Sequence, residues 1–545
     1  MREVVARRRK IPTKSELIQL QQLYKTDERI GERLGGVPAY LVAYWRRKKG
    51  VPKHSLPKFS EKEIRTLWER FGNDDRCGLE LGISKPAFYN WRRRYGIREK
   101  PAFLKLEQLE LSFPGIGLSS RTDSLYGERS LVHKLMACAA GGDNVESGQT
   151  ILIEPVLALS RNDTAEVIGL FNESGAEYVF NPNRIAIALS PILVSQSVQS
   201  SRKLKLIRDF ARRQSIRSFF DMGEGVGHQV AMEHGLILPG QVQAATNAYA
   251  CSFGAVAGLA SHIDSQMMAD LWVKGQLSVD VPRVTQVTID GRRVRGVYSR
   301  DIAAAVVRDV GRMDTPGRAL EFCGATIPHM SVSERFTLCR AAVDAGCSFA
   351  VCRFDSVTRR YLSGRAIGNY QPLFADKDAV YDDSISLSVD GLSPQLIGGE
   401  KSHPVLPVAE REDQPVHQIV LGTECCGRFE DLRVAADMLK GKKVHPDCRL
   451  LVFPGSRSVY IEALKKGLIR VFVEAGAMVM NPSSGADLAG LIGSPAPGER
   501  WLATADVSLL NAIDTSESEL YLCSPATAAA SALNASITDP TRYIK

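Results

Sequence analysis

The sequence contains no uninterrupted run of about 18 apolar residues, which is the length that a membrane-spanning helix needs. The first ten residues are rich in arginine and lack the apolar stretch of a signal peptide. Eleven cysteines among 545 residues include no Cys-x-x-Cys pair and show no spacing typical of a disulfide framework. We therefore expect a cytoplasmic protein with reduced thiols and no membrane contact.

Extremes of composition are absent as well. Apolar residues make up 44% of the chain and charged residues 24%, which excludes a disordered or fibrous polymer. A length of 545 residues is far above the roughly 100 to 200 of one domain, so we expect two to four folding units.

Positive charge is concentrated at one end of the chain. Residues 1–100 hold 25 of the 69 lysines and arginines and 12 of the 61 aspartates and glutamates, a net charge of +13. The remaining 44 basic and 49 acidic residues give residues 101–545 a net charge of −5. This asymmetry indicates a polyanion-binding module joined to an acidic body.

The basic segment contains one pattern twice. Residues 26–35 (TDERIGERLG) match residues 73–82 (NDDRCGLELG), and WRRKKG at 45–50 matches WRRRYG at 91–96. We interpret the repeat as one structural unit that is used twice.

Each copy is expected to form three short helices. In the second copy, Ser60 is placed to cap a helix over residues 61–71, and Ser84 is placed to cap a helix through Tyr95. A turn at Gly82 precedes this last helix, and Trp45 and Trp91 are expected in the two cores.

Residues 79–97 resemble the helix-turn-helix units of transposase-like and resolvase-like DNA-binding domains, in which the third helix enters the major groove. The resemblance implies that its early residues reach base edges and that its basic end contacts phosphates. The implied nucleic-acid-binding residues are Lys85, Tyr89, Asn90, Arg92, Arg93 and Arg94, with Tyr40, Tyr44, Arg46, Arg47, Lys48 and Lys49 in the first copy. The alternative is a pair of small packing modules whose lysines and arginines form a solvated face.

The rest of the chain alternates short apolar runs with amphipathic stretches. The expected strands are 151–155, 184–189, 418–421 and 449–453, with helices over 202–214 and 431–440 among the intervening segments. Such alternation predicts an α/β body with mostly parallel sheets.

Several motifs follow one another in this body: GEGVGHQ at 223–229, HGLILPG at 234–240, SFGA at 252–255, YLSGR at 361–365, RFEDLR at 428–433, KGKKVHPD at 440–447 and FPGSRSVY at 453–460. Together they resemble the aconitase superfamily, most closely the large subunit of isopropylmalate dehydratase. The resemblance implies an aconitase-like body of several α/β subdomains, preceded by two small all-α helix-turn-helix units. The expected division is a basic arm (1–12), two helix-turn-helix units (13–55 and 56–100), a linker (101–126), the aconitase-like domain (127–536) and a tail (537–545).

The family's [4Fe-4S] cluster is held by three cysteine thiolates, and soft sulfur ligands suit iron–sulfur clusters. The resemblance places Glu424, Ser484 and Asp487 at those three positions. Cys425 and Cys426 adjoin the first position and could restore one ligand. We therefore expect no cofactor and no cluster. Glu424 and Asp487 could instead belong to an oxygen-ligand site for Mg²⁺ or Mn²⁺, or fill a vacated pocket.

By the same resemblance, the family's substrate-binding and proton-transfer segments correspond to residues 247–250, 190–191 and 506–509. The residues at these positions differ from those of the family. His228 and Asp163 remain as a residual pocket, either as working groups or as hydrogen-bonded structural residues, and no catalytic residue is assigned. The family's small swivelling domain is not found in this chain, so a partner subunit could supply it.

Two interpretations of function follow. The first is a nucleic-acid-binding, DNA-directed regulatory protein whose body is a catalytically degenerate, cluster-free domain for sensing, dimerisation or partner contact. Duplex DNA is the expected partner, with RNA and a homodimer left open. The alternative is a lyase or hydratase of the same superfamily that acts on a hydroxy-acid without the usual cluster. Whether the chain is an enzyme is left open, with preference for a non-enzyme.

Overall fold

The computed structural model describes residues 11–24, 26–52, 59–71, 85–97, 128–142, 144–189, 197–399, 402–483, 496–512 and 518–544, with positions 74, 77, 81 and 83 between them. The chain divides into two compact units, residues 1–121 and residues 122–545. Among the described residues, no helix is long and apolar enough to cross a membrane.

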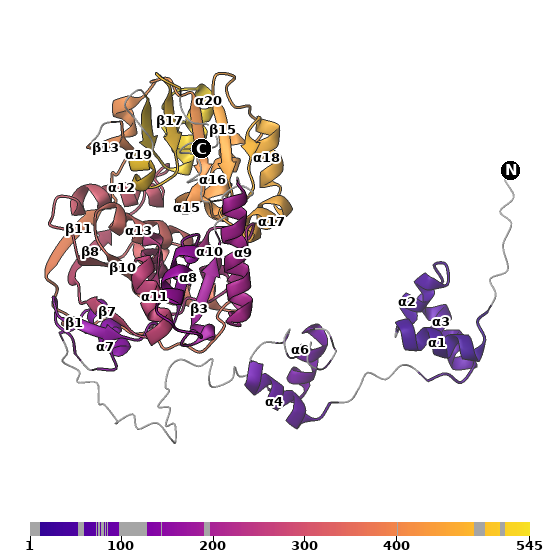
Figure 1. Cartoon of the computed structure of the whole chain (residues 1–545). Helices are drawn as coiled ribbons and strands as arrows, with labels where there is room; N and C mark the ends of the chain where they lie inside the picture. Colours follow the sequence, from indigo (N-terminus) through magenta and orange to yellow (C-terminus); the bar gives the residue numbers. More distant parts are fainter. Residues whose placement is uncertain are drawn as a thin grey trace. The chain divides into compact units, whose positions relative to one another are not determined.

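The N-terminal unit is helical where it is described (Figure 1). Its helices are α1 (Lys14–Tyr24), α2 (Asp27–Arg33), α3 (Ala39–Lys48), α4 (Glu61–Phe71) and α6 (Lys85–Arg94). The predicted helix over residues 61–71 is confirmed, and Ser60 caps it as expected. The Glu63 amide donates to the Ser60 hydroxyl at 3.3 Å, while the Ser60 amide donates to the Glu63 carboxylate at 2.8 Å.

Two separate small cores stabilise these helices. Trp45 lies in the first core together with Leu17, Ile30 and Val42. The second core is built on Ile64, Trp68, Cys77, Phe88 and Ile97, and Trp91 packs against it while remaining half-buried. The α1–α3 segment and the α4–α6 segment, called the first and second modules below, therefore each have a core of their own.

The two modules contain the same internal ion pair. The Arg46 Nε lies 3.0 Å from the Asp27 carboxylate, and the Arg92 Nε lies 2.8 Å from that of Asp74. The Nη1 of each arginine also donates to a carbonyl oxygen five residues further along the chain. The shared contact indicates that the sequence repeat corresponds to a repeated structure. It also gives Arg46 and Arg92 a role inside the modules.

We predict that Arg92→Ala destabilises the second module by about 2 kcal/mol, because it leaves the half-buried Asp74 carboxylate without its ion pair. Hydrogen exchange of residues 85–97 in the full chain measures this as faster amide exchange. Arg93→Ala is the matched control, since Arg93 is exposed on the same helix. Equal exchange in the two variants would contradict an internal role for Arg92.

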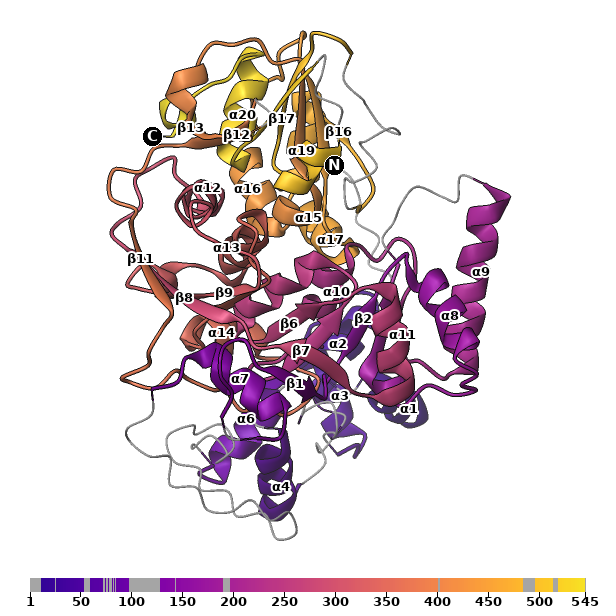
Figure 2. The same cartoon turned by 60° about the vertical axis from the view of Figure 1, so that its left-hand side comes forward.

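The described part of the body contains four sheets, and the predicted α/β class is confirmed. One parallel sheet has the order β4-β3-β2-β5-β6 and another the order β10-β9-β8-β11. A seven-stranded mixed sheet, β13-β12-β18-β17-β14-β15-β16, lies at the opposite end of the body from the antiparallel β1–β7 pair (Figure 2). The strands are β1 (Thr150–Ile153), β2 (Ala158–Ser160), β3 (Ile185–Ala188), β4 (Ser218–Phe220), β5 (Val242–Ala245), β6 (Leu259–His262), β7 (Leu277–Asp280), β8 (Arg283–Asp290), β9 (Arg318–Cys323), β10 (Phe349–Cys352), β11 (Asp383–Ser388), β12 (Gln395–Gly398), β13 (Val405–Pro407), β14 (Gln418–Gly422), β15 (Arg449–Phe453), β16 (Met478–Val479), β17 (Arg500–Ala503) and β18 (Glu519–Leu522).

Helices surround these sheets. They are α7 (Leu131–Ala139), α8 (Thr164–Glu173), α9 (Val198–Arg213), α10 (Gly227–Glu233), α11 (Ser265–Lys274), α12 (Ser299–Val310), α13 (Val332–Asp344), α14 (Ser356–Leu362), α15 (Thr423–Cys426), α16 (Phe429–Leu439), α17 (Arg457–Lys465), α18 (Leu468–Ala475), α19 (Val507–Ala512) and α20 (Pro525–Asn534). Short 3₁₀ segments are η2 (Pro182–Arg184), η3 (Ala248–Val256), η4 (Ile327–His329), η5 (Val408–Arg411) and η7 (Pro540–Tyr543).

The predicted strands at 184–189, 418–421 and 449–453 correspond to β3, β14 and β15, all in parallel pairings. The expected strand at 151–155 forms β1, but it pairs antiparallel with β7 outside the main sheets. Its alternating exposed and buried residues show that only one of its faces is covered, as is typical of an antiparallel pair.

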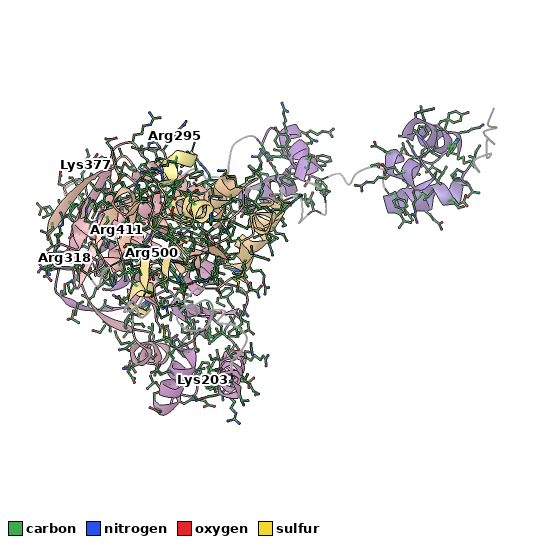
Figure 3. All side chains as sticks on the ribbon, turned by 90° about the horizontal axis from the view of Figure 1, so that it is seen from above. Lys203, Arg295, Arg318, Lys377, Arg411 and Arg500 are labelled. Atoms are coloured by element: carbon green, nitrogen blue, oxygen red, sulfur yellow. The ribbon has the colours of Figure 1, made fainter. Side chains whose placement is uncertain are left out.

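Ion pairs connect the amino ends of strands within two of the sheets. Arg500 at the start of β17 contacts Glu519 at the start of β18 at 2.7 Å. Arg318 at the start of β9 pairs with Asp383 at the start of β11 and donates to Thr285 on the intervening β8 at 3.2 Å. Figure 3 labels both arginines. These ion pairs stabilise the sheets at the amino ends of their strands. They do not occupy the opposite, carboxyl ends, where a site can form.

A buried carboxyl links α12 to the seven-stranded sheet. Asp301 is 1% exposed and accepts the amide hydrogens of Tyr298 at 2.8 Å and Gln395 at 2.9 Å. Burial raises the pKa of Asp301 to about 7, since the charged form loses its water.

A raised folded-state pKa means that the folded protein holds a proton that the unfolded chain has already released. The Asp301 contribution to stability therefore falls as the pH rises from about 4 to about 7. We predict that the Tm of the Asp301→Asn variant, relative to the Tm of the parent, increases by about 2 °C or more as the pH rises from 5 to 8. Thermal unfolding at several pH values measures this, with the exposed Asp378→Asn as control. A difference in Tm that does not change with pH would contradict the buried, proton-holding carboxyl.

Candidate active site

The carboxyl ends of β2 and β14, strands of two different sheets, meet through one ion pair. Arg161 directly follows β2, and Glu424 lies in α15 directly after β14. The Arg161 Nη2 lies 2.8 Å from the Glu424 Oε1, and the Glu424 side chain is only 5% exposed. Ligand sites of open α/β sheets form outside the carboxyl ends of their strands. The residues around this pair are therefore the candidate site.

His228 lies at the centre of this region, in the first turn of α10, and is 1% exposed. Its Nε2 lies 3.3 Å from the Glu424 carbonyl oxygen, which accepts a hydrogen bond. Its ring stacks on Tyr249 with centroids 4.9 Å apart, and Phe336 packs against it at 5.2 Å. The imidazole is thus fixed in orientation by one hydrogen bond and two rings.

The surroundings of His228 are electropositive. Burial lowers the pKa of His228 well below its usual value, and the positive charges of Arg161, Arg428 and Arg340 lower this pKa further. The ring is therefore neutral, and with Nε2 donating, Nδ1 is a proton acceptor. Among the described residues, Nδ1 has no hydrogen-bond partner. The cations suit an anionic substrate, whose negative charge would offset their effect and raise the pKa of His228 again.

The loop that carries Glu424 has an unusual backbone. Gly422 has φ of +112°, and an added Cβ would clash with the Phe453 carbonyl. Thr423 has φ of +70°, a conformation that is costly for a β-branched residue. The Gly422 amide donates to the Thr504 hydroxyl at 2.7 Å, and the Thr423 hydroxyl donates to the Thr504 carbonyl at 3.3 Å. Contacts with the loop after β17 therefore hold Glu424 in place.

A buried network of charges lies under this loop. Arg340 stacks on the Tyr249 ring at 4.0 Å and lies 3.6 Å from Asp506 and 3.4 Å from Asp344. The Cys425 thiol donates to Asp506 at 3.2 Å. Burial raises the pKa of Asp506 to about 6 and that of Cys425 to about 12, so Cys425 carries its proton at neutral pH.

The two residues of the predicted pocket have different surroundings. The structure brings His228 and Glu424 together, as described above. Asp163 is half-buried at the start of α8, and its carboxylate accepts the Arg161 amide hydrogen at 2.9 Å. Asp163 thus shapes the turn that carries Arg161. Ser484, Asp487 and residues 190–191 lie outside the described residues, so the proposed oxygen-ligand metal site stays a prediction.

The arginines of the site were not anticipated. Arg161, Arg340 and Arg300 were assigned no role, yet Arg300 lies 3.4 Å from Asp344 in the same network. The sequence did carry a signal, because Arg300 precedes the apolar run IAAAVV and Arg340 interrupts the run TLCRAAV. Charged residues in buried helix stretches require partners, which marks them as candidates for a site.

The predicted nucleic-acid-binding residues differ in their exposure. Arg46 and Arg92 are held inside their modules by the ion pairs described above. Exposed side chains are those of Tyr40, Tyr44, Arg47, Lys48, Tyr89, Asn90, Arg93 and Arg94, and Lys49 is half-buried. The Lys85 side chain lies outside the described residues. A role of these surfaces in binding nucleic acid stays a prediction.

Comparison with known proteins decides the family. Residues 192–535 match the model of the aconitase family (aconitate hydratase). The chain belongs to the aconitase family. The large subunit 1 of 3-isopropylmalate dehydratase from Methanopyrus kandleri is 36% identical over 417 residues, which cover 76% of this chain and 100% of that protein. The large subunit from Halothermothrix orenii is 34% identical, over 75% of this chain and 98% of that protein.

A solved structure, the holo-form of Thermococcus kodakaraensis aconitase X, matches 70% of this chain and 90% of its own chain. With a TM-score of 0.42 and 13% identity, it is too distant to support a conclusion about function.

These findings correct two expectations. The preferred interpretation, a DNA-binding regulatory protein with a degenerate body, is wrong, because the body matches complete dehydratase large subunits at 34–36% identity. The expectation of no cofactor and no [4Fe-4S] cluster is also overturned, because large subunits of this family normally bind such a cluster.

The described residues alone do not supply a ligand set for that cluster. Among them, no group of three His, Cys, Asp or Glu side chains is placed to hold a metal ion. Glu424 is paired with Arg161, and the buried Cys425 thiol is protonated. The chemistry proposed for the pocket therefore uses only what the chain's described side chains can do.

We predict that Arg161→Met lowers Tm by about 2 °C or more, because it leaves the buried Glu424 carboxylate without its partner. Adding Glu424→Gln should recover part of this loss, since the uncompensated charge is then gone. Thermal unfolding of the full chain measures both effects. The matched control is Arg208→Met, whose pair with Asp221 is about one-third exposed or more on both sides. A decrease in Tm of equal size in the Arg208→Met control would contradict a special role for the Arg161–Glu424 pair.

Proposed function

We propose that this chain is the large subunit of a hydro-lyase that removes water from, or adds it to, a hydroxy-acid anion. The observation that carries the proposal is the extent of the match, which spans 98–100% of two large subunits of 3-isopropylmalate dehydratase. An added domain or a shared fragment would match only part of such a protein.

The chemistry of the candidate site supports the proposal. Burial and, after it, three guanidinium groups lower the pKa of His228, and these groups provide an electropositive environment for a carboxylate substrate. The unpartnered Nδ1 of His228 is available to accept a proton, and burial keeps competing water away from it. His228 is the residue that we propose as the base, while Arg161 and Tyr249 position it.

A partner subunit belongs to the same proposal. The relatives are named as large subunits, and a large subunit implies a small one that completes the enzyme. We propose that a small subunit covers the candidate site at the carboxyl ends of β2 and β14. A cytoplasmic location fits this proposal, because all eleven cysteines are free thiols.

The N-terminal modules are an addition to this enzyme. The relatives cover 75–76% of the chain, so about a quarter has no counterpart in them. We propose the division stated from the sequence, with a basic arm, two helical units at 13–55 and 56–100, and a linker before the enzyme body.

The test is turnover of 3-isopropylmalate by the full chain, purified without oxygen and combined with the small subunit of a related dehydratase. Appearance of the unsaturated acid is followed by ultraviolet absorbance. We expect His228→Asn to lower kcat by at least about a hundredfold, since it removes the proposed base. His329→Asn, which changes an exposed histidine, is the control and should retain activity. An active His228→Asn enzyme would overturn the role of His228, and no turnover of any hydroxy-acid would overturn the function.

A further inference from the structure

Helix α9 is longer than its neighbour α8. Because β2 and β3 are parallel and each is followed by one of these helices, α8 and α9 run in the same direction. Their carboxyl ends are level, since the Phe171 and Phe210 rings pack edge to face at 5.5 Å. The Gln214 side chain also bonds to the backbone of Glu177 and Val179, just after α8. With 16 residues against 10, α9 reaches about 9 Å further than α8.

The additional residues of α9 lie at its amino end. Residues 198–203, called the projecting end below, extend beyond the start of α8 (Figure 2). The start of α8 carries Asp163, whose carboxylate accepts the Arg161 amide hydrogen. The projecting end is therefore at the edge of the sheet where the candidate site lies. The buried residues of α9 are all in its second half: Ile207, Phe210 and Ala211.

The positive charges of α9 differ between its two halves. Arg202 and Lys203 of the projecting end are exposed, and they form no ion pair with any described residue. Figure 3 labels Lys203. The body as a whole carries a net charge of −5, so these two unpaired cations are a local exception. In the second half, the basic residues that pair with the carboxylates of Asp209 or Asp221 are Lys205, Arg208 and Arg212.

Two exposed apolar side chains accompany these charges. Val198 is 71% exposed and Leu206 is 40% exposed. Residues four apart are neighbours on a helix surface, so Val198, Arg202 and Leu206 form one continuous stripe. Single exposed apolar residues are common on protein surfaces. Here two of them flank an unpaired cation, which suits contact with a protein partner, while two are too few to hold a helix in a membrane surface.

We propose that this stripe is a docking surface for the small subunit. The partner presents carboxylates to Arg202 and Lys203 and an apolar depression to Val198. This inference rests on the proposed function, because that function implies the small subunit. A subunit that covers the carboxyl end of β2 meets the projecting end of α9, since both lie at the same edge of the sheet. Opposite charges on the two surfaces speed their association and fix its orientation.

The test is binding of the small subunit of a 3-isopropylmalate dehydratase to the full chain, measured by isothermal titration without substrate. We expect the double substitution Arg202→Glu with Lys203→Glu to weaken binding at least about tenfold, because it places like charges opposite the carboxylates of the partner. Val198→Ser should weaken binding about threefold, since less apolar surface is then buried. In the parent complex, amide exchange of residues 197–206 should become slower.

Arg212→Glu with Arg213→Glu is the matched control, because it makes the same change of charge at the other, exposed end of α9. These positions lie about 15 Å further along the helix, beyond the screening length of about 8 Å, so the affinity should change less than about twofold. Thermal unfolding shows that each variant is folded.

Three results would overturn the proposal: no complex with the parent chain, equal affinity of the parent and the Arg202→Glu, Lys203→Glu chain, or an equal loss of affinity in the control. A complex that forms as expected but shows no turnover would overturn the hydro-lyase and support this surface. Turnover together with unchanged affinity in the double variant would support the hydro-lyase and overturn this surface.

Discussion

The pairing of Arg161 with Glu424 connects two sheets that are far apart in sequence. Neither charge could be buried alone, because an uncompensated ion in a protein interior costs several kcal/mol. Together they bring the loop after β2 against the loop after β14, and the Glu424 carbonyl then fixes the His228 ring. The position of the proposed base thus depends on an ion pair formed by other residues.

Much of the body could be predicted from its sequence. Buried parallel strands such as β14 and β15 appear as apolar runs, and their bounds followed from that pattern. The strand β1 was also predicted, but its antiparallel pairing was not, because an apolar run does not specify its pairing partner. The motifs identified the superfamily. The expectation of a DNA-binding regulator was wrong, because it rested on changed residues at a few ligand positions, whereas the match extends along the whole large subunit.

The arginines of the site show what a local pattern leaves out. Arg340 contacts Tyr249 and Asp506, which are about 90 and about 170 residues away along the chain. Such partners are set by packing and not by neighbours in sequence. Arg92 illustrates the same difficulty, since a row of three arginines reads as one charged face although its first member turns inward to Asp74. The sequence contains the charges, while the fold decides which of them meet water.

Each N-terminal module has its own core and its own arginine–aspartate pair. A duplicated unit of this kind does not rely on its twin for internal contacts, so a substitution that weakens one copy leaves the interior of the other intact. The surfaces of the copies are then free to change separately. They already differ, because the residues before the shared tryptophans are Ala43 and Tyr44 in one copy and Tyr89 and Asn90 in the other.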